Sequence, residues 1–161
     1  MAIPRGRIVK RKDQLPHWQA GGSAYHIDFN CRPFDLSAGE REIVIEIVRK
    51  GDELFFDLLL GCVMPDHVHL LLRPREEVPD HFHDLARIRK GIKGASARLI
   101  NLRRKRCGPF WQDEGYDRII RNHAEYGETF TYILNNPVAA GLCASPEDYP
   151  FMILARDELR W

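Results

Sequence analysis

The chain has 161 residues, of which 44% are hydrophobic and 29% are charged. This balance is typical of one globular domain with its own core, and we predict a single domain over 1–161. No apolar segment has the length of a signal peptide core or a membrane span, so we expect a cytoplasmic protein. The four cysteines are irregularly spaced, which argues against a disulfide framework and a structural zinc site.

The formal net charge of +1 hides an uneven distribution of charge. Residues 5–12 carry five basic side chains and no acid, and residues 87–106 carry nine and no acid. The rest of the chain holds 10 basic residues against 23 acidic ones. A solvated helix face and a loose tail would also give such clusters. The absence of acids across 87–106 nevertheless favours a surface that binds a polyanion, and nucleic acid in particular.

The first half of the chain is predicted to form a strand, a helix and a strand pair. Residues 23–31 alternate between apolar and polar side chains, as a half-buried strand does. A capping-box signature that starts at Ser37 opens an amphipathic helix over 37–51. Two apolar runs, 53–64 and 67–73, are separated by a Pro-Asp pair and predict two antiparallel strands joined by a short turn.

The second half is predicted to add a helix, a strand and a last helix. Apolar residues recur at steps of three and four over 81–102, a short strand follows over 116–122, and the helix 123–137 ends at its proline. The order β-α-β-β-α-β-α indicates a ferredoxin-like split βαβ fold of the α+β class. It has a four-stranded antiparallel sheet, helices on one face and an added C-terminal helix. We expect residues 1–20 to form a basic N-terminal arm and 145–161 an irregular tail.

The segment "MPDHVH", residues 64–69, places two histidines at the start of a buried strand. Side chains at i and i+2 of a strand point to the same face, so His67 and His69 can share one metal ion. Val68 points the other way, into the core, and Asp66 is expected to face away with it. A hydrogen-bonded pair of histidines at a sheet edge is the alternative interpretation of the motif.

The last predicted helix carries a second pair of polar residues. Tyr132 and Asn136 are separated by four positions, so their side chains lie one turn apart on the same face of the helix. A tyrosine and an asparagine in this arrangement suit a nucleophile and a metal ligand. A surface tyrosine beside an asparagine that ends a helix would also explain them.

Together these segments resemble a known family. "MPDHVHLLLRP", a basic helix, "FWQDEGYDRIIRN" and "YILNNPVAAGL" follow one another as in the single-tyrosine HUH transposases, and "YHIDFNCRP" resembles the first strand of that family. The likeness runs from about residue 20 to 150 and is greatest for the branch of REP-associated tyrosine transposases (RAYT). It implies that His67 and His69 are metal ligands and that Tyr132 is the nucleophile. Asn136 matches the third ligand position, where related transposases often have glutamine.

The resemblance implies an enzyme rather than a binding module. Its expected activity is metal-dependent, site-specific cleavage and strand transfer of single-stranded DNA that carries a hairpin, through a covalent 5′-phosphotyrosine intermediate and with Mg²⁺ or Mn²⁺ as the cofactor. We expect a monomer rather than a homodimer, located in the cytoplasm and associated with the nucleoid. One alternative is a domesticated relative that binds DNA hairpins and no longer cuts. A small-molecule metalloenzyme on the same scaffold is another, and it leaves the acid-free basic segment unexplained.

The basic side chains of the two clusters are the predicted DNA contacts. They are Arg5, Arg7, Lys10, Arg11 and Lys12 in the arm, and Arg87, Arg89, Lys90, Lys93, Arg98, Arg103, Arg104, Lys105 and Arg106 in the helix and at its end. Trp18, Phe110 and Trp111 could stack on bases. Core packing is the expected role of Phe110 and Trp111.

Overall fold

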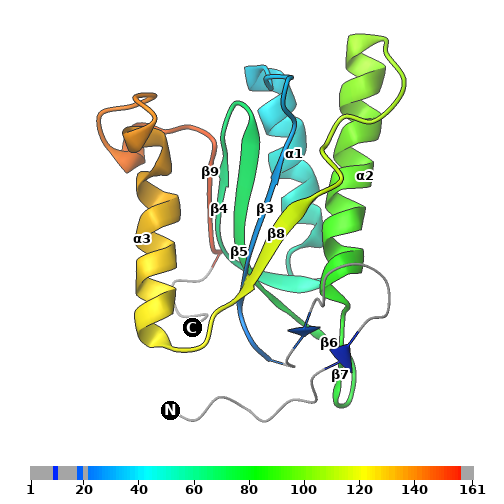
Figure 1. The fold of residues 1–161 in the computed structure, drawn as a ribbon, viewed down its shortest axis with the longest axis vertical. Coiled ribbons are helices and arrows are strands. Elements are labelled where there is room, and N and C mark those ends of the chain that lie inside the picture. The colour runs from blue at the N-terminus through cyan, green and yellow to red at the C-terminus, as the bar shows by residue number, and fades with distance from the viewer. Residues whose placement is uncertain (1–8, 11–17, 20–21, 157–161) are drawn as a thin grey trace.

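The computed structural model describes residues 9–10, 18–19 and 22–156. A five-stranded antiparallel sheet in the order β8-β3-β5-β4-β9 forms its centre, with two helices beside one face and a third beside the other (Figure 1). The elements of this body are β3 (Tyr25–Asn30), α1 (Ala38–Gly51), β4 (Phe56–Val63), β5 (His67–Pro74), α2 (Leu85–Arg104), β8 (Gly115–Ile119), α3 (His123–Ala139) and β9 (Met152–Leu154). Two small ladders pair β1 (Val9–Lys10) with β2 (Trp18–Gln19) and β6 (Glu76–Val78) with β7 (His81–Phe82), and a 3₁₀ turn spans Pro146–Asp148.

The four strands expected from the sequence form the order β8-β3-β5-β4, which confirms the ferredoxin-like α+β fold. The observed sheet has one strand more than the four that the sequence predicted. Met152–Leu154, in the tail predicted to be irregular, pairs with β4 and extends the sheet as β9. Within the predicted N-terminal arm, Val9–Lys10 and Trp18–Gln19 pair in a ladder that the sequence did not indicate. Short strands of this kind give no periodic signal, and only the partner strand reveals them.

Several element boundaries differ from the predicted ones by two to four residues. Helix α2 begins at Leu85 rather than at 81, because the Asp84 side chain accepts a hydrogen bond from the Arg87 backbone N–H and caps the helix there. Strand β8 ends at Ile119, three residues before the predicted end. Helix α3 continues through Pro137 to Ala139. A proline this close to the end of a helix removes one of the last backbone hydrogen bonds and leaves the rest intact.

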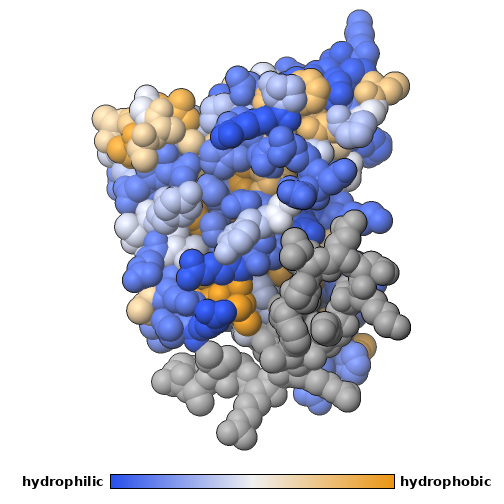
Figure 2. All heavy atoms as spheres, viewed as in Figure 1, coloured by the Kyte–Doolittle hydropathy of each residue, from blue (hydrophilic) through white to orange (hydrophobic). Residues whose placement is uncertain are grey.

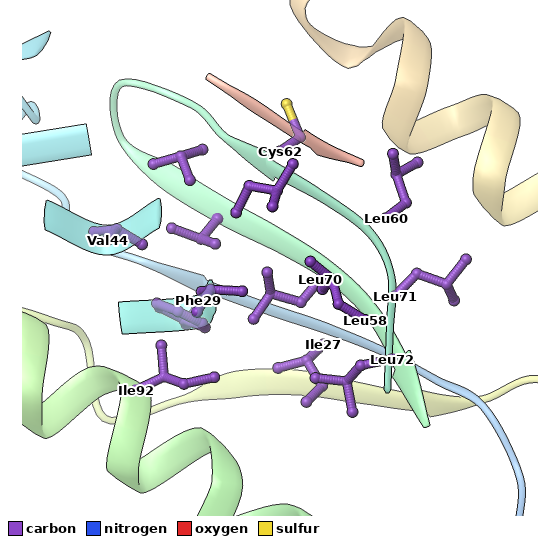
Figure 3. Packing of buried hydrophobic residues seen from close by; sticks show 14 of the residues in the cluster. Ile27, Phe29, Val44, Leu58, Leu60, Cys62, Leu70, Leu71, Leu72 and Ile92 are labelled. Carbon is purple, nitrogen blue, oxygen red and sulfur yellow. The ribbon is translucent and has the colours of Figure 1, made fainter. Parts of the chain in front are cut away.

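Apolar side chains cover both faces of the sheet. Ile27, Phe29 and Leu72 are fully buried on the face that packs against α1 and α2, whereas Leu60 and Leu71 point toward α3 (Figure 3). A register shift in β4 between Leu58 and Leu60 accommodates this two-sided pattern. The continuous apolar runs of the two central strands therefore reflect burial on both faces.

The aromatic residues after α2 belong to the core, as expected. Trp111 is 6% exposed, its Nε1–H donates to the Ser96 hydroxyl at 2.9 Å, and its ring meets Phe29 edge to face at 4.8 Å. Phe110 is buried beside it. The side chain of Trp18 lies outside the described residues. All four cysteines are free thiols, as the spacing predicted.

Hydrophilic residues cover most of the face seen in Figure 2, and the C-terminal end of α2 projects as a strongly hydrophilic tip. A smaller apolar area lies over the loop that follows α3, in which Leu142 is 45% exposed (Figure 2). Within the described part of the chain, no helix combines the length and the apolar character that crossing a membrane requires.

Candidate active site

The two histidines of β5 lie on the face of the sheet that α3 covers. His67 is opposite Asn30 of β3 and His69 is opposite Asp28, so all four side chains project from the same face. The two imidazole rings are 4.7 Å apart between centroids and nearly perpendicular. His69 is 4% exposed, whereas His67 is partly open to solvent.

Asp66 holds His67, contrary to the expectation that it faces away. Its Oδ1 lies 2.6 Å from His67 Nδ1, and its Oδ2 accepts a hydrogen bond from Arg32 Nε at 2.8 Å. Burial works against ionisation of Asp66, but these hydrogen bonds outweigh it and lower the pKa of the carboxyl. The carboxylate therefore accepts a hydrogen bond from the Nδ1–H of His67 and leaves Nε2 as the atom available for coordination.

His26 of β3 holds the second histidine. Its Nε2 is 3.1 Å from His69 Nδ1, and the two rings are 5.2 Å apart. Burial, with a smaller contribution from Arg118, lowers the pKa of His26 to about 4. Burial, together with His67 and His26, lowers the pKa of His69 to about 3. Both imidazoles are therefore neutral at pH 7, the state in which a ring nitrogen can bind a metal ion.

Helix α3 brings Tyr132 and Asn136 to these histidines. Asn136 Oδ1 lies 3.3 Å from His67 Nε2, across 69 residues of sequence. The Tyr132 ring packs edge-on against His69 at 5.5 Å and against His26 at 6.3 Å. Tyr132 nevertheless remains 55% exposed, so a large substrate has access to the side chain.

The donors around this point suit a divalent cation. His67 Nε2 and Asn136 Oδ1 lie 3.3 Å apart, close enough for one cation to be bound by both atoms. His69 Nε2 is buried and has no hydrogen-bond partner among the described residues. A buried polar atom without a partner is costly, and coordination would satisfy it. The structure thus brings His67, His69, Asn136 and Tyr132 together, while their chemical roles remain predictions.

Three polar residues near the cluster were not predicted as site residues. His26 and Asp28 stand on the polar side of the alternating strand β3, and Arg118 of β8 lies opposite His26. The alternation of the first strand placed His26 and Asp28 on one face, but which strand they meet depends on the sheet order. Arg118 is 47% exposed and adds a positive charge at the edge of the cluster.

Four of the nine basic residues predicted to bind DNA in 87–106 make contacts inside the fold. Arg89 pairs with buried Asp117 at 2.6 Å, and Lys93 Nζ donates to the Gln112 carbonyl. Further along, Arg104 pairs with Glu40 at 2.6 Å. Arg106 donates to Asn101 and to the carbonyl of Pro109.

The other five basic residues of this segment are exposed. They are Arg87, Lys90, Arg98, Arg103 and Lys105. Over the first four turns of α2 the exposed positions are three cations and two glycines, namely Arg87, Lys90, Gly91, Gly94 and Arg98. A side chain at Gly91 or Gly94 would meet no atom within 4 Å, so this face is open.

The basic residues predicted in the N-terminal arm cannot be placed in the same way. Arg5, Arg7, Arg11 and Lys12 lie outside the described residues, as does the side chain of Lys10. Their assignment as DNA contacts therefore stays a prediction.

Comparison with known proteins was made on sequence and on fold. The family described as "Transposase IS200 like" matches residues 37–136, more than half of the chain. A Haemophilus influenzae protein assigned as a REP-associated tyrosine transposase is 26% identical over 107 residues. That match spans 63% of this chain and only 61% of the relative.

Two solved structures are similar to the fold. A REP-associated tyrosine transposase bound to a REP hairpin superposes with a TM-score of 0.65 at 21% identity, over 94% of this chain and 82% of the other. A protein from Deinococcus radiodurans assigned as a transposase gives a TM-score of 0.47 at 23% identity, over 84% of this chain and 97% of the other. The match to the hairpin-bound transposase structure supports the fold, and the family match over residues 37–136 shows which family the chain belongs to. The chain therefore belongs to the family of IS200-like transposases.

Proposed function

We propose that the protein cleaves single-stranded DNA next to a hairpin and rejoins it, with Tyr132 as the nucleophile and a divalent cation as the cofactor. One observation carries this proposal: the imidazoles of β5 and the Tyr132–Asn136 pair of α3 meet at one point on the sheet. Family membership supports a transposase, and the likeness to a relative bound to a REP hairpin supports hairpin DNA as the substrate.

The proposed reaction balances without an external energy source. The Tyr132 hydroxyl loses its proton and its oxygen forms a bond to the scissile phosphorus, while the P–O3′ bond breaks and the 3′ oxygen takes up a proton. The product is a 5′-phosphotyrosine and a free 3′-hydroxyl, and attack by a 3′-hydroxyl reverses the step. A divalent cation bound by His67, His69 and Asn136 would neutralise and orient the phosphate. The Tyr132 ring lies 5.5 Å from the His69 ring between centroids and is exposed, so the nucleophile is next to the ligands and open to a substrate.

The domesticated alternative, a hairpin-binding protein that no longer cuts, would need only the basic face of α2. Orphaned His69 Nε2 and the Asp66–His67 pair favour the cleaving enzyme, because a binding module gains nothing from buried imidazoles held in this way.

The test is an assay for a covalent adduct with the full-length protein. Hairpin oligonucleotides with single-stranded flanks, labelled on the 3′ side of the cleavage point, are expected to give an SDS-resistant protein–DNA band with Mg²⁺ or Mn²⁺. EDTA is expected to remove the band and leave hairpin binding in a gel-shift assay. Binding without any adduct across the hairpin panel, in either metal, would contradict the proposal and support the domesticated alternative.

The exposed face of α2 is expected to bind phosphates. Lys90 and Arg98 flank two glycines that let a DNA backbone approach the helix closely. The double variant Lys90→Gln/Arg98→Gln should weaken hairpin binding and lower the slope of log K against log salt by about 1 for each phosphate that it no longer neutralises. The matched control is Arg49→Gln/Arg156→Gln, which removes two exposed charges that do not line the groove beside Arg98. Equal slopes for the two variants, measured by fluorescence anisotropy, would exclude this face as the DNA-binding surface.

A further inference from the structure

The ligand set implied by the resemblance contains no negative charge. His67 and His69 are neutral donors, and Asn136 offers an amide oxygen. Mg²⁺ and Mn²⁺ are hard cations that favour carboxylate oxygens, so a site of this composition is weak by itself. Asp66 does not supply the charge directly, because its two oxygens already face His67 Nδ1 and Arg32 Nε.

Asp28 is the carboxylate that the fold places at the cluster. It stands directly opposite His69 across the β3–β5 pair, on the same face of the sheet. Ligand atoms of His26, Asp28 and His69 all lie within 4.8 Å of one another. The carboxylate is half-buried, and its Oδ1 accepts a hydrogen bond from the Tyr116 backbone N–H at 3.2 Å.

Among the described residues, no lysine or arginine pairs with Asp28, and its Oδ1 is held only by the backbone N–H of Tyr116. A half-buried carboxylate in this condition is stabilised by a cation placed next to it.

His26 is a positioning residue rather than a further ligand. Its Nε2 and His69 Nδ1 are 3.1 Å apart, so one of them donates to the other. When His69 Nδ1–H is the donor, His69 Nε2 becomes a lone pair that is buried and without a partner among the described residues. The two groups on this side of the cluster with a lone pair available for a metal ion are then His69 Nε2 and the carboxylate of Asp28.

We propose that Asp28 is the anionic ligand of a hard divalent cation, Mg²⁺ or Mn²⁺, on the His69 side of this cluster, with His69 Nε2 as its neighbouring ligand. The inference rests on the metal dependence in the proposed function. It goes beyond the family likeness, because that likeness assigns the ligand roles to His67, His69 and Asn136 and gives none to Asp28. Asp28 would add one negatively charged oxygen to ligands that are otherwise neutral, and this charge would raise the affinity of the site for such an ion.

The test measures Mn²⁺ binding to the full chain without DNA, from the electron paramagnetic resonance signal of free Mn²⁺. Asp28→Asn keeps an acceptor for the Tyr116 N–H and removes the charge, and it is expected to weaken Mn²⁺ binding roughly 10- to 100-fold. Asp28→Ser should do the same. Glu114→Gln is the matched control, since Glu114 is exposed beside the start of β8 and its loss changes the net charge equally.

Thermal unfolding provides a second readout that a merely structural role would not give. Without metal, Asp28→Asn should unfold at the same or a higher temperature than the unchanged protein, because it removes a poorly compensated charge. With saturating Mn²⁺, only proteins that keep Asp28 should show the full increase in unfolding temperature. His69→Ala is the reference for loss of the site.

The outcomes separate the two proposals. If the unchanged protein binds no Mn²⁺ without DNA, this inference is contradicted, and the metal dependence of the proposed function is decided separately by the adduct assay with Mg²⁺, Mn²⁺ and EDTA. If the unchanged protein binds and His69→Ala does not, while Asp28→Asn and Asp28→Ser match Glu114→Gln, then Asp28 is not a ligand and the proposed function stands. Weaker binding in both Asp28 variants, with Glu114→Gln unchanged, supports the assignment.

Discussion

Tyr132→Phe is expected to abolish the covalent adduct with hairpin DNA, by roughly 10³-fold or more, because it removes the atom that attacks the phosphate. The phenylalanine ring keeps the edge-on packing against His69 and His26. Hairpin affinity and the unfolding temperature should therefore stay close to those of the unchanged protein. The measurement combines the SDS gel for the adduct with fluorescence anisotropy for binding.

Tyr116 supplies a matched control for this experiment. It is 56% exposed, against 55% for Tyr132, and it projects from the same face of the sheet, opposite Asp28. Tyr116→Phe is expected to leave the adduct unchanged, because no helical partner like Asn136 accompanies Tyr116. An adduct of normal yield from Tyr132→Phe, or its loss in Tyr116→Phe, would move the nucleophile away from α3.

Glu40→Gln is expected to lower the free energy of unfolding by about 3 kcal/mol at pH 7. Glu40 is 3% exposed and receives both Nε and Nη2 of Arg104, at 2.6 and 2.7 Å. The same carboxylate closes the capping box of α1 by accepting the Ser37 N–H at 2.8 Å. One group thus ties the start of α1 to the end of α2, and the amide retains neither its charge nor two strong acceptors.

The pH dependence of the stability loss in Glu40→Gln follows from the lowered pKa of Glu40. The Arg104 hydrogen bonds lower the pKa of Glu40 from 4.5 to about 2. A depressed carboxyl pKa means that the contribution is complete above pH 4.5, the value for the unfolded chain, and is lost as the pH falls toward 2. The stability gap between the unchanged protein and Glu40→Gln should therefore close between pH 4.5 and 2 in urea titrations.

The control for this variant lies on the same helix. Glu42→Gln removes an exposed carboxylate from α1 and should change the stability by less than about 0.5 kcal/mol. A Glu40→Gln protein that tracks the Glu42→Gln protein at every pH would show that the ion pair with Arg104 is not a major support of the fold.

Much of the local structure of this protein could be predicted from its sequence. Period-two alternation located β3, period-three-and-four spacing located α1 and α2, and the capping box at Ser37 marked the start of α1. The order of these elements was enough to predict the ferredoxin-like sheet. These signals are local, because backbone periodicity and capping depend on residues only a few positions apart.

The pairing of Tyr132 with Asn136 was also predictable, since four positions make one helical turn. Whether that turn faces His67 was not predictable, because it depends on the packing of α3 against the opposite face of the sheet from α1 and α2. The 3.3 Å approach of Asn136 to His67 joins residues 69 positions apart. Such a contact arises only when the whole domain has folded.

Three further features depend on tertiary packing in the same way. The strand order places Asp28 beside His69 and His26 behind it, and no spacing within β3 reveals either neighbour. The packing of α1 on α2 brings Arg104 into an ion pair with Glu40, whereas the sequence alone leaves Arg104 as one more exposed cation. The basic run of α2 looks uniform in sequence, but burial of one side of the helix divides it into cations that hold the fold and cations left exposed to meet a phosphate.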